Sequence, residues 1–388
     1  MTTHLLNTYA PAPDVFVGGS GAELRTQDGR IYLDFLAGIA VSALGHNHPR
    51  LVRELTDQLG QAIHLSNLYR HPYAQDVATR IARLSGLEAV FFTNSGTEAN
   101  ECAIKIARKV AYKKGDTKRT GLLALEGSFH GRSMGSVSLT HTEKYRKPFA
   151  PLLPGVEFVA PGDTARLETL LSTRTFQALF LEPIQGEQGV KELPHDFLRA
   201  ARELCTKTGT LLVHDEVQAG CGRTGTFLSA DAAGVKPDVA TLAKPIAAGL
   251  PMGCTVVSKE FADVFEPGDH GSTFAGGPFV CRGALVFLDL MEHGGLQEAV
   301  LARGAELRAG LADLKGEFPV ITELRGRGLM QGVRLSRGAE DLQKKLYAKG
   351  LITNRTAGDV IRILPPYVVT SEQIARGVSI LREALAEL

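Results

Sequence analysis

Lys244 lies in a stretch of small and apolar residues, VATLAKPIAAGLPMG (239–253). No acidic residue is near it in the sequence, and Pro245 follows it directly. A lysine is rarely buried without a partner, because moving an ammonium group out of water is costly. Burial also lowers the pKa of a lysine, so that its neutral amine can attack an aldehyde. The stretch therefore predicts a nucleophilic amine at Lys244.

Carboxylates follow two apolar runs that are typical of buried strands. LLVH leads directly into Asp215 and Glu216, and LFL leads into Glu182. Ligands of parallel sheets bind beyond the carboxyl ends of the strands, where these acids are expected. A buried carboxylate needs a cationic or hydrogen-bonding partner. Capping a helix is the alternative role for Asp215, and the adjacent acids make it the weaker one.

NSGTEAN (94–100) opens a predicted helix. Ser95, Gly96 and Thr97 offer backbone N–H groups and hydroxyls at the helix N-terminus, where the helix dipole favours a phosphate. Ser95 with Glu98 also fits a capping box, and one turn can serve both purposes. A phosphate site, a carboxylate and a nucleophilic lysine together match pyridoxal 5'-phosphate, an aldehyde whose ring nitrogen needs an acidic partner. We therefore expect the lysine to hold this cofactor as a Schiff base.

Alternating strands and helices must position these residues. Buried strands are expected where short apolar runs are bounded by turn residues, over 121–127, 177–187, 209–220 and 254–258. Helices are expected over 97–114 and 194–209, where apolar residues recur three or four apart. This alternation predicts an α/β fold in which helices cover both faces of a mostly parallel sheet.

The character of the sequence changes after about residue 278. Helical stretches lead into strand-like runs, over 282–293, 296–317, 325–335 and 360–370. We therefore expect three parts: an N-terminal segment over 1–47, a large domain over 48–278 and a smaller α+β domain over 279–388. A strand signal within 22–35 is expected to join the N-terminal segment to the smaller domain.

The composition is that of an ordinary globular protein, with 388 residues, 44% hydrophobic and 22% charged. A formal net charge of +1 gives no reason to expect nucleic-acid or membrane binding. We find no signal peptide and no apolar window of about 18 residues, so a cytoplasmic location is expected. The five scattered cysteines predict reduced, buried thiols. His46 and His48 lack a third ligand nearby, so no metal is expected, and a role in a turn or in lining a site is favoured.

Motifs over nearly the whole chain resemble those of the class III (subgroup II) pyridoxal-phosphate aminotransferases. They are LDFLAGIAVSALGHNHP (33–49), HLSNLYRHP (64–72), FFTNSGTEANECAIKIAR (91–108), SFHGRSMGSVSLT (128–140), EPIQGEQGV (182–190), HDEVQAGCGRTG (214–225), DVATLAKPIAAGLPMG (238–253), GDHGSTFAGGP (268–278), RGRGLMQG (325–332) and IRILPP (361–366). The resemblance implies a fold type I transferase with a seven-stranded, mostly parallel sheet, and a homodimer with shared active sites.

The resemblance also implies roles for single residues. Lys244 would carry the cofactor, Asp215 would pair with its ring nitrogen, and Gln218 would lie near its phenolic oxygen. Lys244, Asp215 and Glu187 would be the catalytic residues. The cofactor site as a whole would comprise Ser95, Gly96, Thr97, Phe129, Asp215, Glu216, Val217, Gln218, Lys244 and, from the other subunit, Thr273.

The substrate residues follow in the same way. Arg132 is similar to the residue that binds the distal carboxylate of an acylated substrate. Arg362 is similar to the residue that binds the α-carboxylate of glutamate or 2-oxoglutarate, and Glu187 resembles the switch that otherwise pairs with it. Ser272 is similar to a substrate-contacting position. Planar guanidinium groups facing carboxylates suit this chemistry, although a surface ion pair is the alternative for each arginine.

The motifs lean toward family members of arginine biosynthesis that transfer the terminal amine of N2-acetyl-L-ornithine to 2-oxoglutarate. The products would be N-acetylglutamate 5-semialdehyde and L-glutamate. Succinyl-diaminopimelate, ornithine and 4-aminobutyrate are the alternative amines, and ornithine is disfavoured because ornithine-specific members carry a tyrosine in place of Ile39. A mutase on the same fold and a non-catalytic cofactor-binding module are less favoured. The Glu187–Arg362 switch argues against the first, and the retained Lys244 and Asp215 argue against the second.

Overall fold

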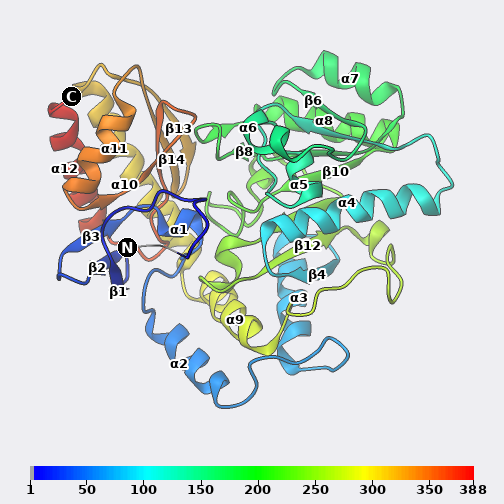
Figure 1. The fold of residues 1–388 in the computed structure, drawn as a ribbon, viewed down its shortest axis with the longest axis horizontal. Helices are drawn as coiled ribbons and strands as arrows, with labels where there is room; N and C mark the ends of the chain where they lie inside the picture. The colour runs from blue at the N-terminus through cyan, green and yellow to red at the C-terminus, as the bar shows by residue number, and fades with distance from the viewer. Residues whose placement is uncertain (1–3) are drawn as a thin grey trace.

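The computed structural model describes residues 4–388, and its largest element is a seven-stranded sheet (Figure 1). In spatial order its strands are β4 (Ala89–Thr93), β12 (Gly253–Val257), β11 (Val239–Leu242), β10 (Leu211–Asp215), β7 (Phe176–Leu181), β5 (Gly121–Leu125) and β6 (Val156–Val159). Only β12 runs antiparallel to its neighbours within this sheet. The predicted α/β fold with a mostly parallel sheet is confirmed.

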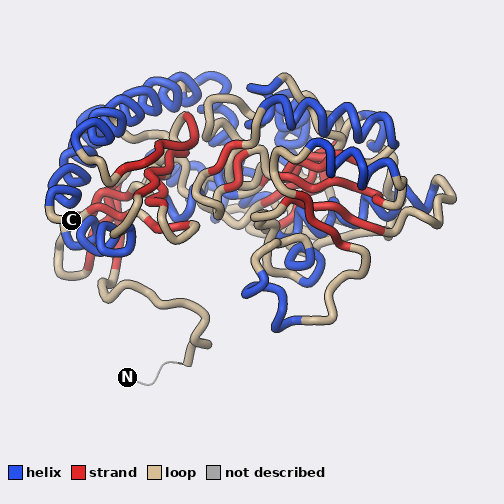
Figure 2. Tube along the Cα trace, turned by 90° about the horizontal axis from the view of Figure 1, so that it is seen from above, coloured by secondary structure: helices blue, strands red, loops and turns tan. Residues whose placement is uncertain are grey.

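Helices cover both faces of this sheet, as Figure 2 shows. The longer ones are α2 (Pro49–Leu59), α3 (Pro72–Ser85), α4 (Gly96–Lys113), α7 (Thr164–Ser172), α8 (His195–Thr208) and α9 (Pro278–His293). Short helical turns and a small hairpin connect them: α1 (Ala37–Ala40), α5 (Met134–Ser138), α6 (Glu143–Arg146), η1 (Lys147–Phe149), η2 (Ser229–Ala233), η3 (Lys244–Ala247), η4 (Lys259–Phe261), β8 (Ile184–Gln185) and β9 (Lys191–Glu192).

The strands of the sheet are apolar along their whole length because both of their faces are buried. In β5, Leu123 and Leu125 join the core formed with α7 and α8. Leu122 and Ala124, which alternate with them, join the core formed with α4. Side chains of a strand point alternately to opposite faces, so a continuous apolar run is what a sheet between two helix layers requires.

A smaller α+β part follows α9. Its antiparallel sheet has the order β13 (Ile321–Arg327), β14 (Met330–Leu335), β17 (Val360–Ile363) and β16 (Asn354–Thr356). Its helices are α10 (Leu296–Glu317), α11 (Ala339–Ala348) and α12 (Ser371–Ala386). Leu307, Leu311 and Leu314 of α10 are buried in the core that this part shares with the strands and helices around it.

The N-terminal segment pairs with the C-terminal part of the chain. Its sheet has the order β1 (Phe16–Ser20), β2 (Glu23–Thr26), β3 (Ile31–Asp34) and β15 (Leu351–Ile352), and β3 runs parallel to β15. Residues 1–3 of the predicted segment lie outside the described residues. α9 packs against α2, α3 and η3 of the predicted large domain. The domain boundaries at 47/48 and 278/279 stay predictions.

Three sequence features have structural places away from the sheet. His46 Nε2 lies 2.9 Å from a carboxylate oxygen of Asp34, and His48 accepts a hydrogen bond from Leu51 N–H at the start of α2. Over residues 4–388 no group of three His, Cys, Asp or Glu side chains is placed to hold a metal ion. The five cysteines are free and buried. No helix within that range is long and apolar enough to cross a bilayer.

Candidate active site

A cavity of about 430 Å³ opens where β7, β10 and β11 end. Most of the predicted site residues line it: Ser95, Gly96, Thr97, Phe129, Arg132, Glu187, Asp215, Val217, Gln218 and Lys244. They come from segments far apart in the sequence, because the carboxyl ends of parallel strands meet at one edge of the sheet. Asn100 and His130 line the same cavity and were not predicted. Glu182, which was expected at the end of a strand but given no role, lines it as well.

Lys244 begins η3 directly after β11, and its backbone has a φ of 45°. This left-handed conformation is costly for a residue other than glycine, and such strain gathers at functional sites. Burial lowers the pKa of its amine, although the carboxylate of Asp215 partly opposes this shift. The charge of Arg362 lowers that pKa further, and Glu187 and Glu182 oppose it. The sequence shows no acid near this lysine, but the fold brings three to it.

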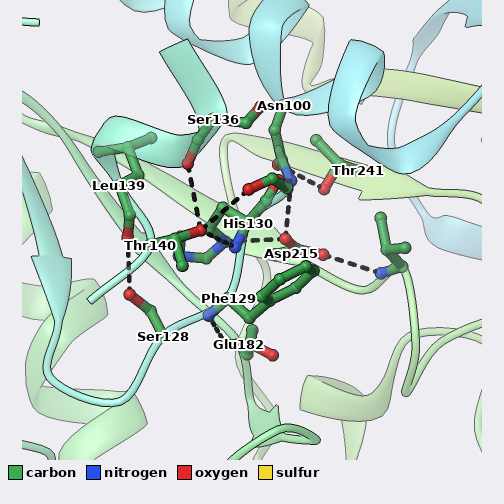
Figure 3. A network of polar contacts seen from close by, with 12 residues as sticks. Asn100, Ser128, Phe129, His130, Ser136, Leu139, Thr140, Glu182, Asp215 and Thr241 are labelled. Carbon is green, nitrogen blue, oxygen red and sulfur yellow. Dashed lines mark hydrogen bonds and ion pairs between the residues drawn. The ribbon is translucent and has the colours of Figure 1, made fainter. Parts of the chain in front are cut away.

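Asp215 is the last residue of β10 and the centre of a buried hydrogen-bond network (Figure 3). Its Oδ2 accepts from Asn100 Nδ2 at 2.7 Å and lies 2.8 Å from His130 Nδ1. Its Oδ1 accepts from the Val217 N–H at 3.0 Å. Burial would raise the pKa of Asp215, but the hydrogen bonds and the charge of the imidazole hold it below its ordinary value. The network therefore keeps a buried carboxylate ionised.

Two residues that support Asp215, Asn100 and His130, were missed in the sequence. Asn100 Nδ2 also donates to the His130 carbonyl at 2.8 Å, and its Oδ1 accepts from the Thr241 hydroxyl at 3.0 Å. The His130 N–H in turn donates to Thr140 Oγ1 at 3.0 Å. Asn100 ends the NSGTEAN motif and His130 lies between Phe129 and Arg132, so both were inside quoted motifs. Their pairing with Asp215 is long-range and has no local signal.

The predicted phosphate site forms the first turn of α4. Ser95 is its N-cap and accepts from the Glu98 N–H at 3.3 Å. The carboxylate of Glu98 accepts from the backbone N–H of Asn94 at 2.6 Å, one residue before the N-cap. The expected capping box is therefore only half formed. The N–H groups of the first turn, which have no partner within a helix, lie at the cavity wall.

Two glycines bring the backbone close to this turn. A Cβ at Gly96 would lie 2.6 Å from Val217 Cγ1, and a Cβ at Gly131, whose φ is 131°, would lie 2.3 Å from Thr97 Oγ1. Real Cβ atoms do not approach that closely, so glycine is required at both positions. Thr97 Oγ1 also lies 2.7 Å from Ser133 Oγ and accepts from the Arg132 N–H at 3.2 Å. The loop after Phe129 is thereby fixed to the helix turn.

Glu187 lines the cavity and forms an ion pair with Arg362, which is buried and is not among the residues that line the cavity. Arg362 Nη1 donates to Glu187 Oε1 at 2.6 Å and to Gln218 Oε1 at 3.0 Å, and its Nε donates to Asn354 Oδ1 at 3.1 Å. Burial would raise the pKa of Glu187, but the charge and hydrogen bond of Arg362 lower it below its ordinary value. Thr356 Oγ1 donates to the Glu187 carbonyl at 2.5 Å. The backbone of Glu187 is thus held by the smaller sheet.

Glu182 directly follows β7 and also lines the cavity. Its Oε2 accepts from the Phe129 N–H at 2.9 Å. Burial raises the pKa of Glu182 well above its ordinary value, and the charge of Asp215 adds to this effect. A neutral carboxyl group therefore lies beside the ionised carboxylate of Asp215, as expected when two acids share one buried site.

Arg132 differs from Arg362 because it lines the cavity. Its side chain is exposed toward the cavity, and no acidic side chain of residues 4–388 forms an ion pair with it. Its guanidinium carbon instead lies 3.6 Å from the ring centre of Tyr145. The group is free to bind a carboxylate that enters the cavity.

Ser272 and Thr273 lie outside the main cavity of their own chain. They line a second cavity of about 660 Å³, together with Asn67 and Leu68. The hydroxyl of Ser272 accepts from Asn94 Nδ2 at 3.0 Å, so this loop touches the wall of the main cavity. The contact of Ser272 with substrate, and of Thr273 with the cofactor of another subunit, stay predictions.

The predicted residue Glu216 does not line the cavity either. Its side chain points away from it, and its Oε1 accepts from the Ala230 N–H at 3.0 Å. Its backbone N–H donates to the Thr241 carbonyl at 2.9 Å, so the backbone is occupied too. Burial raises the pKa of Glu216 to about 7. Adjacent residues of a strand face opposite sides of the sheet, which is why Asp215 reaches the cavity and Glu216 does not.

The residues around the cavity fit pyridoxal 5'-phosphate. The first turn of α4 offers N–H groups to a phosphate, and Gly96 and Gly131 allow Val217 and Thr97 to pack closely around this turn. The buried, ionised Asp215 suits a protonated ring nitrogen. The amine of Lys244, with its lowered pKa, lies at the same cavity and suits an aldehyde.

Comparisons with known proteins agree with this geometry. The family model "Aminotransferase class-III" matches residues 8–385. The acetylornithine aminotransferase of Rhodobacter capsulatus is 43% identical over 100% of this chain and 99% of its own, and that of Synechocystis sp. is 41% identical over 100% and 92%. The solved ornithine aminotransferase of Toxoplasma gondii, described with PLP at its active site, has a TM-score of 0.94 at 33% identity and covers 99% of this chain and 92% of its own.

This chain belongs to the class-III aminotransferase family. The predicted family and the predicted fold type are confirmed, and the chain is an aminotransferase.

Proposed function

We propose that this aminotransferase uses pyridoxal 5'-phosphate to transfer the terminal amino group of N2-acetyl-L-ornithine to 2-oxoglutarate. The products are N-acetylglutamate 5-semialdehyde and L-glutamate. Relatives named for acetylornithine are 41–43% identical over the full chain, which supports this substrate over the other amines of the family. This reaction would place the enzyme in arginine biosynthesis.

One observation carries the proposal: Arg132 and Glu187 both line the cavity, and the carboxylate of Glu187 pairs with the buried Arg362. The charge of Arg362 is neutralised by Glu187, whereas Arg132 has no acidic partner within residues 4–388. N2-acetylornithine carries a single carboxylate, far from its reacting amine, and 2-oxoglutarate carries two. Arg132 would bind the distal carboxylate in both cases. Arg362 would bind the second carboxylate of 2-oxoglutarate once Glu187 has moved aside.

Lys244 and the residues around it have separate roles toward the cofactor. When bound, pyridoxal 5'-phosphate supplies a carbonyl carbon that takes up the amino group and a ring that accepts electrons. Asp215 keeps its negative charge at the ring nitrogen, supported by Asn100 and His130. The amine of Lys244 has a lowered pKa and moves the proton between the reacting carbon atoms. The N–H groups of the first turn of α4 would hold the phosphate.

Ile39 supports the choice against free ornithine. It belongs to the turn α1, where Ala37, Ile39 and Ala40 all have positive φ values, and it is 38% exposed. Val41, directly after this turn, lines the cavity. Val41 presents an apolar side chain to the cavity, and Ile39 lies two residues before it in the sequence. An acylated amine, which carries no charge on its α-nitrogen, suits an apolar side chain better.

A comparison of four amino donors tests the proposal. The purified holoenzyme is given N2-acetylornithine, succinyl-diaminopimelate, ornithine or 4-aminobutyrate with 2-oxoglutarate, and kcat/KM is measured for each. We expect the highest value for N2-acetylornithine, with ornithine lower by about tenfold or more. A higher kcat/KM for another of these amines would refute the proposed substrate and would name its replacement.

A homodimer is the proposed assembly. Leu68, Tyr69 and Phe274 are 88%, 70% and 69% exposed around the second cavity, and large exposed apolar side chains in one place mark a protein contact. The loop of Ser272 and Thr273 lies in the same region, so a second copy would bring these residues to its partner's site. Light scattering should give twice the chain mass of 41.6 kDa. An active monomer would contradict this assembly. The cytoplasmic location stays a prediction.

A further inference from the structure

The guanidinium group of Arg132 is held between two aromatic rings. Its guanidinium carbon lies 3.6 Å from the ring centre of Tyr145 and 5.4 Å from that of Phe129. The two rings meet edge to face, with 6.2 Å between their centres. Phe129 is expected to contact the cofactor, whereas neither the motifs nor the proposed mechanism gives Tyr145 a role. Tyr145 makes the closer of the two contacts.

Tyr145 is presented by a short helix that is itself held in place. α6 follows α5 after a loop, and Arg146, the next residue, places its guanidinium carbon 4.6 Å from the ring centre of Phe158 in β6. His141 packs edge to face against the same ring at 5.1 Å. Two contacts on both sides of Tyr145 therefore attach this segment to the edge strand of the large sheet. The tyrosine ring is a fixed platform for Arg132.

Stacking affects what Arg132 can do. When the flat face of a guanidinium group stacks on an aromatic ring, its N–H groups, which point outward in the guanidinium plane, stay free. They can then bind a carboxylate in a forked geometry. An exposed arginine without this platform would sample many rotamers, and binding would have to restrict them. No acidic side chain of residues 4–388 forms an ion pair with Arg132, so its guanidinium group is available to an anionic substrate in the cavity.

We infer that Tyr145 is a positioning residue that determines specificity for substrates with a distal carboxylate. It acts through Arg132 and does not touch the reacting atoms. The inference rests on the proposed function, because the carboxylate in question is that of N2-acetylornithine or the distal one of 2-oxoglutarate. Because the Tyr145 ring positions Arg132, it raises kcat/KM for an amine that carries the carboxylate relative to the same amine without it.

A pair of donors that differ only in the carboxylate provides the test. N2-acetylornithine and N-acetylputrescine have the same acetamide and the same reacting amine, but the second lacks the carboxylate. In Tyr145→Leu we expect kcat/KM for N2-acetylornithine to fall by about five- to tenfold, mainly through KM, because the platform is lost. The value for N-acetylputrescine should stay within about twofold of the parent, since that amine makes no use of Arg132.

Two matched variants accompany this change. Tyr145→Phe keeps the ring and should restore kcat/KM for N2-acetylornithine to within about twofold of the parent. Tyr112→Leu removes another tyrosine that lies near a cation, Lys109 at 5.9 Å, on the exposed face of α4. That variant should leave kcat/KM unchanged for both donors. Equal losses with both donors in Tyr145→Leu, or an unchanged kcat/KM for N2-acetylornithine, would overturn the inference.

Binding of glutarate gives a second measurement that does not depend on turnover. Glutarate has two carboxylates and no group that can react, and its Kd for the holoenzyme can be measured by calorimetry. We expect Tyr145→Leu to raise the Kd of glutarate by about five- to tenfold and Tyr145→Phe to leave this Kd unchanged. An unchanged Kd in Tyr145→Leu would overturn the inference. If the parent enzyme itself failed to use N2-acetylornithine, the proposed function would fail instead, and the glutarate result would still decide the role of Tyr145.

Discussion

Arg362 and Glu187 form an ion pair whose two members are not equally exposed. The atoms Nη1 and Oε1 are 2.6 Å apart, and the side chain of Arg362 is 1% exposed whereas that of Glu187 is 36% exposed. Arg362 is also fixed by Asn354 and Gln218. Within residues 4–388, only Arg362 and Gln218 restrain the carboxylate of Glu187 through side chains, although its backbone is held by Thr356. Opening the pair therefore means that Glu187 moves and Arg362 stays.

The first prediction separates the two arginines by half-reaction. Arg362→Ala should slow the half-reaction with 2-oxoglutarate by about ten- to a hundredfold, because a charge-assisted fork to the α-carboxylate is lost. The half-reaction with N2-acetylornithine should change much less. Arg132→Ala should slow both, since both substrates carry a distal carboxylate. Single-turnover spectra of the bound cofactor measure each half-reaction. Equal losses in both for Arg362→Ala would show that Glu187 and Arg362 are not a switch.

The second prediction concerns the lysine in the apolar stretch. Lys244→Ala should lose the visible absorbance of the lysine-bound cofactor, and turnover should fall by about a hundred- to ten-thousandfold, because the amine that moves the proton is gone. Lys259→Ala, at an exposed lysine of η4, is the matched control and should keep both the spectrum and the rate. Near-normal turnover in Lys244→Ala would remove the basis of the whole mechanism.

The third prediction concerns the charge of Asp215. Asp215→Ala should still bind the cofactor at Lys244 but slow both half-reactions by about a hundredfold or more, because the ring nitrogen loses its anionic partner. His130→Phe removes one of the groups that keep the pKa of Asp215 low, so this pKa should rise. The acid limb of the pH profile of kcat should then move to higher pH. If Asp215→Ala reacted within a few-fold of the parent, another group would be the partner of the ring nitrogen.

Local patterns predicted the elements that have strong periodicity and clear ends. The helix expected over 296–317 is α10 (Leu296–Glu317), and the strand expected over 121–127 is β5 (Gly121–Leu125). Their apolar spacing and flanking glycines are properties of the segment itself. β4, β6 and β11 were not predicted from the residues. β4 is only partly buried and β6 contains a glutamate, so neither is a plain apolar run, and pairing with neighbouring strands defines all three.

Site residues could be predicted where a charged residue stands among apolar neighbours in the sequence. Lys244 in an apolar stretch and Asp215 after a strand are of this kind, and both line one cavity. Asn100 and His130 could not be found in this way, because an asparagine in a helix and a histidine in a loop are ordinary residues. Only the fold brings them to Asp215, across 115 and 85 positions of sequence. The platform of Tyr145 under Arg132 is hidden for the same reason.

The last prediction uses Glu216, which the fold buries away from the cavity. Burial raises the pKa of Glu216 from 4.5 to about 7, so the folded protein keeps its proton at pH values where the unfolded chain has lost it. The stability from the neutral group is fully present below pH 4.5 and is lost as the pH rises toward 7. Over this window the free energy of unfolding should fall by about 1.4 kcal/mol per pH unit because of this group.

Glu216→Gln removes this titration. Its melting temperature should therefore decline less than that of the parent between pH 5 and pH 7, when both are measured by calorimetry with cofactor bound. Glu157→Gln makes the same chemical change at an exposed position of β6 and should follow the parent. The visible spectrum of the cofactor should be unchanged in Glu216→Gln, because this side chain points away from the cavity toward Ala230. Parallel melting curves for the parent and Glu216→Gln over this pH range would show that Glu216 is already ionised in the folded protein, and a lost cofactor spectrum would return Glu216 to the cofactor site.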